Sequence, residues 1–166
     1  MKRAIAIAMV AGALMVPVSG HAQQAYDEQL ASYQECAQVT HDAYPAEGEW
    51  PTKAEADAAI AVCEKTLAFM EETLARPDLT PALLAYSRYW AGDTHRQLGF
   101  LMGARQMGTT GTVVAEPAMC EHAEKALSYA DGLEAMKFAE EDAQKVIEDL
   151  VGQIRKKANI VAGYCD

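Results

Sequence analysis

Apolar residues recur along most of this chain at the spacing of an α-helix. The clearest stripe advances by alternating steps of four and three residues: Ala56, Ile60, Cys63, Leu67, Met70 and Leu74. A stripe of this kind runs along one side of a helix and packs against a neighbouring element. No segment combines a two-residue alternation with β-branched residues, the pattern typical of strands. The chain is therefore predicted to be all-α.

Prolines, glycines and capping residues divide the pattern into separate helices. Thr52 and Glu55 match a capping box, and Thr80 followed by Pro81 matches the N-cap and first position of another helix. The expected helices cover approximately residues 24–42, 52–76, 81–105, 117–130 and 133–163. We predict stacked antiparallel helical hairpins, or a small helical bundle, with five or six helices.

Three glycine-containing segments set the remaining boundaries. The stretch from Met107 through Glu116, with the sequence MGTTGTVVAE, is predicted to be a loop that is either functional or simply a connection. Asp131 and Gly132 are expected to end the fourth helix. Gly152 is expected to interrupt the last one, since glycine weakens a helix interior.

Residues 1–22 match the three parts of a secretory signal peptide. Lys2 and Arg3 precede an apolar run over residues 4–18, and Gly20 and Ala22 are small residues at the −3 and −1 positions of a cleavage site. We therefore expect cleavage near Ala22 and a single mature helical domain over residues 23–166, located in the periplasm or secreted. The mature chain is not expected to insert into a membrane.

Four cysteines lie in this mature part, at Cys36, Cys63, Cys120 and Cys165. An even number in an exported protein, without a CxxC motif, predicts two structural disulfides. Their spacings of 27, 57 and 45 residues match no zinc-binding pattern.

The expected hairpin geometry pairs two of them. Cys36 precedes Trp50 in the predicted first turn by 14 residues, and Cys63 follows it by 13. Residues equally distant from the turn of an antiparallel pair lie side by side, which favours Cys36–Cys63.

Cys120–Cys165 follows by elimination, and its connectivity stays open on the sequence alone. At about 1.5 Å per residue, a straight final helix would pass Cys120 by more than roughly 20 Å. The pairing therefore requires the C-terminal segment to fold back, which we expect near Gly152.

The chain is acidic. It contains 14 basic and 24 acidic residues. Removal of Lys2 and Arg3 with the signal peptide leaves 12 basic residues against the same 24 acidic ones, a net charge near −12. A surface of this sign repels nucleic acid and anionic lipid, so neither is an expected partner. Basic partners or metal cations would be favoured.

Three segments resemble parts of tetratricopeptide repeats. Residues 59–67 (AIAVCEKTL) and 121–127 (EHAEKAL) are similar to second helices of such repeats, and residues 85–99 (AYSRYWAGDTHRQLG) are similar to a first helix. The resemblance covers about half of the mature chain and its motifs are degenerate. Arg88 takes the place of the large aromatic residue, and Pro77 follows Leu67 by ten residues, further than in the family.

The resemblance implies a scaffold without catalytic activity that holds a protein or peptide partner in a groove lined by first helices. On this sequence the corresponding groove positions are Tyr86, Tyr89, Asp93, Arg96 and Gln97. Tyrosine and arginine are also residue types that dominate binding hot spots.

Catalytic and metal-binding patterns are not found. None of the mature serines lies in a G-x-S-x-G turn, and no mature histidine has a second ligand at the helical spacing of a metal site. His95 shares a stripe with apolar residues and is expected to be partly buried. No catalytic residue, metal site or cofactor is predicted.

The sequence therefore favours an exported, non-catalytic helical protein that binds a protein or peptide partner in the cell envelope. Two alternatives remain open. One is a carrier of a small ligand, haem or metal in the interior of a helical bundle. The other is an inhibitor or immunity-type protein that neutralises an enzyme, with the loop from Met107 through Glu116 inserted into the enzyme's cleft.

Overall fold

The computed structural model describes residues 20–43 and 49–165, and the predicted signal sequence lies almost entirely outside this part. The described residues form five α-helices and no strand: α1 (Gly20–Asp42), α2 (Lys53–Leu74), α3 (Pro81–Thr110), α4 (Pro117–Glu134) and α5 (Glu141–Ala162). The all-α prediction is confirmed. None of these helices is long and apolar enough to cross a membrane.

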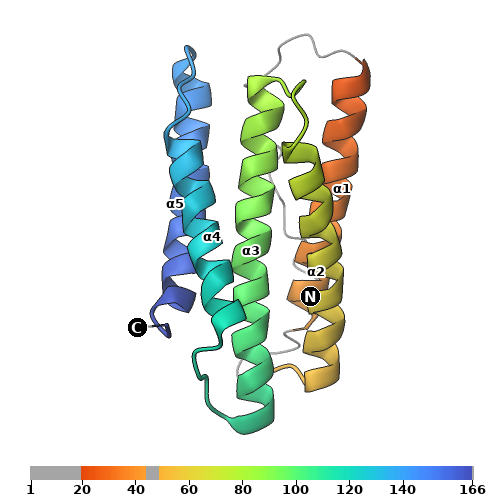
Figure 1. The fold of residues 1–166 in the computed structure, drawn as a ribbon, viewed down its shortest axis with the longest axis vertical. Helices are drawn as coiled ribbons and strands as arrows, with labels where there is room; N and C mark the ends of the chain where they lie inside the picture. Colours follow the sequence, from red (N-terminus) through yellow and green to blue (C-terminus); the bar gives the residue numbers. More distant parts are fainter. Residues whose placement is uncertain (1–19, 44–48, 166) are drawn as a thin grey trace, which may run out of the picture.

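The helices are stacked as antiparallel hairpins around α3 (Figure 1). α3 packs against all four other helices, with the α1–α2 hairpin on one side and the α4–α5 hairpin on the other. Within the described residues the two outer hairpins do not contact each other. Helices α1, α3 and α5 form one layer (Figure 1). On one face of this layer, α2 lies over the groove between α1 and α3, and α4 lies over the groove between α3 and α5.

Capping residues begin α2 and α3 where the sequence pattern places them. Thr52 accepts a hydrogen bond from the Glu55 backbone N–H while the Glu55 carboxylate accepts one from the Thr52 backbone, which completes the capping box. Thr80 accepts from the Leu83 N–H in front of Pro81. Each bond satisfies a backbone donor that the first helical turn leaves unpaired.

The predicted loop from Met107 through Glu116 is shorter than expected, because α3 continues to Thr110. Gly111, with a φ of 73°, ends the helix by donating its N–H to the Met107 carbonyl. Gly108 does not interrupt α3. A Cβ atom there would lie 2.0 Å from the carbonyl oxygen of Pro51, so this glycine permits a close approach of the segment before α2.

The predicted helix ends at Asp131–Gly132 and at Gly152 are wrong. α4 continues to Glu134 because its buried stripe extends to Leu133, and Arg88 of α3 donates a hydrogen bond of 3.0 Å to the Gly132 carbonyl. α5 runs unbroken through Gly152, which faces open space. The cost of about 1 kcal/mol for one helical glycine is outweighed by the apolar stripe on the other side of the helix.

Both predicted disulfides are present. Cys36–Cys63 joins α1 to α2, and Cys120–Cys165 joins the first turn of α4 to the residues that follow α5. The chain reverses over residues 135–140, which continue beyond the end of α4 before α5 begins (Figure 1). This extended connection supplies the length that brings Cys165 level with Cys120, and no break in α5 is needed.

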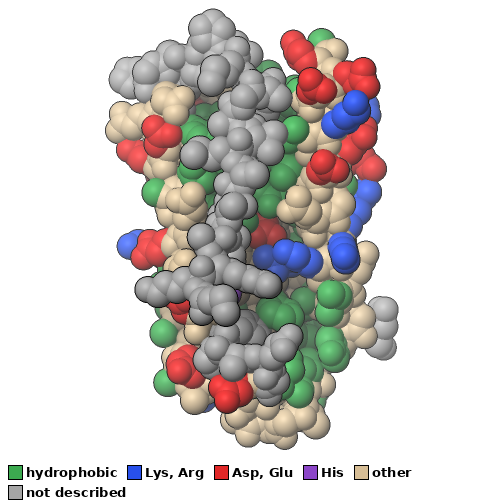
Figure 2. Space-filling model, turned by 180° about the vertical axis from the view of Figure 1, so that it is seen from behind, with side chains coloured by type: hydrophobic (Ala, Val, Ile, Leu, Met, Phe, Trp, Pro, Cys, Tyr) green, Lys and Arg blue, Asp and Glu red, His purple; other side chains and the backbone are tan. Residues whose placement is uncertain are grey.

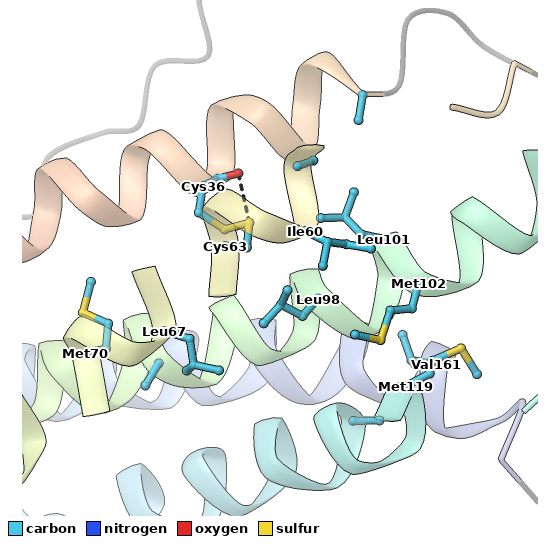
Figure 3. Close-up of a cluster of buried hydrophobic side chains, with 14 of the residues drawn as sticks. Cys36, Ile60, Cys63, Leu67, Met70, Leu98, Leu101, Met102, Met119 and Val161 are labelled. Carbon is cyan, nitrogen blue, oxygen red and sulfur yellow. Dashed lines mark hydrogen bonds between the residues drawn. A yellow bond between two sulfur atoms is a disulfide. The ribbon is translucent and has the colours of Figure 1, made fainter. Parts of the chain in front are cut away.

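The core lies along both sides of α3. One cluster contains the Cys36–Cys63 disulfide with side chains from α2, α3, α4 and α5, among them Met70, Met102 and Met119 (Figure 3). These three methionines fill the interior of the cluster. A second cluster packs small and branched side chains of α4 and α5 against the first half of α3. The Cys36–Cys63 disulfide therefore reinforces the α1–α2 hairpin from within a packed cluster.

Candidate functional site

One stripe of α3 faces the space between α1 and α5. Its members follow each other at steps of four, three or seven residues: Tyr89, Asp93, Arg96, Phe100 and Met107. Within the described residues α1 and α5 do not contact each other, so the two helices flank this stripe without closing over it. We call this surface, made by α1, the Tyr89–Met107 stripe of α3 and α5, the α1–α3–α5 face.

The half of this face near the start of α3 is aromatic. Tyr33 of α1 lies beside Tyr89, with ring centroids 6.1 Å apart, and Tyr26 of α1 packs edge-on against Tyr86 at 5.2 Å. Trp90 is buried beneath these rings. The predicted binding residues Tyr86 and Tyr89 are thus half-buried, and each packs against an aromatic residue of α1.

An ion pair occupies the middle of the face. Arg96 contacts Asp93 through Nε at 2.6 Å and Nη2 at 3.0 Å, and the carboxylate also accepts hydrogen bonds from Tyr33 and Gln97, both at 2.9 Å. Burial acts to raise the pKa of the Asp93 carboxyl, but Arg96 and these hydrogen bonds outweigh it and lower that pKa below its usual value. Asp93 is therefore a satisfied, buried carboxylate.

The five predicted groove residues consequently differ in accessibility. The Asp93 side chain is 6% exposed and Gln97 is buried, so these two support Arg96 from the interior. Arg96, at 13% side-chain exposure, reaches the surface only with a small part of its side chain. Of the predicted set, Tyr86, Tyr89 and Arg96 remain able to contact a partner.

The other half of the face contains an apolar pocket of about 90 Å³. It is lined by side chains and backbone from α3, α4, α5, two connecting segments and the residues after α5: Trp50, Gly99, Phe100, Gly103, Ala104, Met107, Val113, Met119, Ile160, Val161 and Tyr164. Four of these are large and exposed, namely Trp50 at 45%, Phe100 at 37%, Ile160 at 56% and Tyr164 at 54%. Hydrophobic side chains gather at the lower end of this face, below a group of Lys and Arg side chains (Figure 2).

Two glycines of α3 shape the floor of this pocket. A Cβ at Gly99 would lie 3.2 Å from the Val161 side chain and 3.3 Å from the Met119 carbonyl oxygen, so α4 and α5 approach α3 closely there. At Gly103 a Cβ would meet Met119 at 3.6 Å and Val113 at 3.8 Å, which are ordinary contact distances. The missing side chain at Gly103 leaves room in the pocket.

The sequence pattern did not identify this pocket. Its lining extends from Trp50 to Tyr164, and only the packing of the hairpins on α3 brings these residues together. One signal was available: Phe100 is an aromatic residue four positions after Arg96, on the stripe already predicted to face a partner.

A histidine pair lies on the opposite side of α3, between α2 and α4. His95 and His122 approach each other with their Nδ1 atoms 2.8 Å apart, and Tyr129 stacks on His95 with ring centroids 5.6 Å apart. The Nε2 atom of His95 lies 3.6 Å from a carboxylate oxygen of Glu71. Burial, followed by the charges of His122 and Lys125, lowers the pKa of His95 to about 4.

The described residues do not assemble a recognisable catalytic centre. Ser87 is buried, with its hydroxyl donating to Gln29 and to the Leu83 carbonyl, so it is neither exposed nor next to a base. In the described part of the chain no three metal-ligating side chains come close enough to hold an ion together. The α1–α3–α5 face, with its pocket, is the candidate functional site.

The chain matches no protein-family model, and no curated protein or solved structure is significantly similar to it.

Proposed function

We propose that this protein is a non-catalytic binding module that holds a protein or peptide partner on its α1–α3–α5 face, with one apolar side chain of the partner in the pocket. The observation that carries the proposal is the pocket itself, which opens beside four large exposed side chains: Trp50, Phe100, Ile160 and Tyr164. Concave apolar sites rimmed by aromatic residues are where binding energy concentrates in protein interfaces.

The size of the pocket favours an anchor side chain over a carried small molecule. Its volume of about 90 Å³ is smaller than the roughly 150 Å³ cavity that accepts benzene. Pockets that enclose a whole ligand measure about 300–1,000 Å³. One leucine-sized group is the occupant that fits, and the rest of the partner would lie along the face outside.

The net charge of the chain further limits the class of partner that it attracts. The chain has a net charge of −10, so a partner with basic residues around its apolar anchor would be attracted over a distance. Tyr86 and Tyr89 would offer aromatic contact surface about three to four helical turns from the pocket. We therefore propose a basic, apolar-anchored peptide segment as the partner.

Two features support a location outside the cytoplasm. The described residues contain two disulfides, and such bonds persist in the periplasm or outside the cell. The predicted signal sequence agrees with this placement.

The stacking of hairpins, in which α1, α3 and α5 share one layer, is the arrangement that a tetratricopeptide-like scaffold would have.

A matched pair of variants tests the proposal. Ile160→Glu places a charge on the pocket rim, whereas Val114→Glu places the same charge at an aliphatic residue of 66% exposure that does not line the pocket. Each oxidised protein would be immobilised and used to select binding peptides from a random library. In a second experiment, each protein would be crosslinked to its partners in envelope extract.

We expect the unmodified protein and Val114→Glu to select the same peptides, with one apolar residue flanked by Lys or Arg, and Ile160→Glu to lose them. Peptides that bind both variants equally would contradict a role for the pocket. A crosslinked product of twice the chain mass alone would identify a second copy of this chain as the occupant instead.

A further inference from the structure

The His95–His122 contact holds α3 and α4 together on the side away from the pocket opening. The two Nδ1 atoms are 2.8 Å apart, and His95 is 4% exposed. A contact this short between two ring nitrogens requires that one ring donates a proton and the other accepts it. When both rings carry a proton on Nδ1, two donors face each other and the bond is lost.

We propose that the His95–His122 pair is an acid-sensitive switch that keeps the α4–α5 hairpin packed on α3 at neutral pH and loosens this interface when both rings are protonated. Histidine pairs suit this role because their charge changes in the mildly acidic range.

The disulfides determine which elements can separate. Cys36–Cys63 joins α1 to α2, and Cys120–Cys165 joins α4 to the end of α5, so each outer hairpin is covalently closed. Neither bond includes α3. Within the described residues the interface between α3 and the α4–α5 hairpin is therefore held by noncovalent contacts, and the histidine pair lies within it.

Charged groups from three elements face the pair. α2 contributes the carboxylates of Glu64 and Glu71, and α4 contributes Glu121, Lys125 and the uncharged Tyr129 ring that stacks on His95; the Arg88 guanidinium of α3 acts on that tyrosine. α5 presents apolar side chains to this part of α3, Ile154 near Gly92 and Val161 near Gly99. The carboxylates favour a proton on His122, whereas Lys125 opposes protonation of both rings.

The environment of His95 also opposes its protonation. Its Nε2 atom is buried and has no hydrogen-bond partner among the described residues, and the nearest carboxylate oxygen, of Glu71, is 3.6 Å away. Burial lowers the pKa of both histidines, so the pair stays uncharged at neutral pH. The charged pair is thus excluded from the packed state and favours an opened one.

The switch would also act on the pocket, a consequence that rests on the proposed function. Met119 lies one helical turn before His122, and Gly99 lies one turn after His95, and both line the pocket. Movement of α4 away from α3 would displace this wall. A partner would then be bound at neutral pH and released in acid.

Hydrogen exchange on the oxidised protein tests the switch without any partner. Backbone protection factors, which are corrected for the intrinsic effect of pH, would be measured between pH 7 and pH 4 for the unmodified protein, His122→Asn and His41→Asn. His41 is an exposed histidine of α1 that serves as the matched control.

We expect protection in α4 and α5 to fall by roughly tenfold more than in α1 and α2 as the pH decreases. His41→Asn should behave identically, and His122→Asn should lose most of this pH dependence. Equal loss of protection in all five helices, or an unchanged profile in His122→Asn, would overturn the proposal.

Titration of the His95 and His122 ring protons by NMR in the unmodified protein gives a second readout, because independent titration near pH 6.5 would equally exclude the switch. Loss of peptide binding alone, with the exchange profile as expected, would count against the pocket and leave the switch in place.

Discussion

The hydroxyl group of Tyr33 donates a hydrogen bond of 2.9 Å to the Asp93 carboxylate and so connects α1 to the middle of α3 across 60 positions of sequence. Arg96 and Gln97 bind the same carboxylate from one turn further along α3. The bond from Tyr33 is the contribution of α1 to this network. It holds the flank of the α1–α3–α5 face in place beside the ion pair.

Tyr33→Phe tests the strength of that bond. Removing one donor from a buried carboxylate is expected to lower the free energy of unfolding by about 1.5–3 kcal/mol. Urea unfolding of the oxidised protein at pH 7 measures it. Tyr164→Phe is the control, since this tyrosine is 54% exposed and should change stability by less than about 0.5 kcal/mol. Equal effects of the two substitutions would show that the Tyr33 hydroxyl does not stabilise Asp93.

A second comparison uses two glycines of α3. Gly103→Ala is expected to stabilise the fold by about 0.5–1 kcal/mol, because alanine favours the helix and its Cβ would lie 3.6 Å from Met119. Gly92→Ala is expected to destabilise it by about 1–3 kcal/mol, since its Cβ would come within 2.9 Å of Tyr129 and 3.1 Å of Ile154. Thermal unfolding of both variants shows whether each substitution raises or lowers the stability of the fold. A loss of stability in Gly103→Ala would mean that the floor of the pocket is tighter than described.

Removal of the second disulfide should affect the end of α5 most. A cross-link that closes a loop of 45 residues constrains the unfolded chain by up to about 4 kcal/mol. We expect the double variant Cys120→Ser, Cys165→Ser to lose about 2–4 kcal/mol of unfolding free energy. It should also lose amide protection over the last turns of α5. The double variant Cys36→Ser, Cys63→Ser should leave the end of α5 protected. Fraying of α5 in both would indicate that the bond at Cys165 has no local effect.

The sequence pattern predicted the starts of α2 and α3 better than the ends of α3 and α4, and the start of α5 was wrong, since that helix begins at Glu141 and not at Leu133. Thr52 and Thr80 carry local capping chemistry, which depends on a few adjacent residues. The ends at Gly132 and Gly152 depend on what lies across the helix. Arg88 satisfies the Gly132 carbonyl, and the side of α5 opposite Gly152 is buried. Tertiary contacts of this kind override the weak helix propensity of glycine.

The candidate site was predictable only where it follows one helix. Tyr89 and Arg96 lie on a single stripe of α3, so their common orientation follows from helical spacing. The pocket needs Trp50, Val113 and Tyr164 as well, from three separate segments. The Tyr33–Asp93 bond likewise joins two helices. No local pattern records such pairings, because they depend on how the hairpins dock against α3.

The histidine pair predicts how stability depends on pH. The pKa of His95 is about 4 in the folded protein, below its ordinary value of 6.5. The unfolded chain therefore takes up a proton that the folded chain rejects, and folding loses free energy as the pH falls from 6.5 to 4. A shift of this size corresponds to roughly 3 kcal/mol. The loss should begin below pH 6.5 and level off near pH 4.

Unfolding free energies at pH 7, 5.5 and 4 measure this dependence for the unmodified protein, His95→Gln and His41→Gln. His95→Gln should be less stable at pH 7, because the buried bond to His122 is weakened, yet its stability should change less between pH 7 and pH 4. His41→Gln should retain the full slope, since His41 is exposed. Identical slopes for all three proteins would assign the acid sensitivity to carboxylates elsewhere in the chain and leave the histidine pair with a purely structural role.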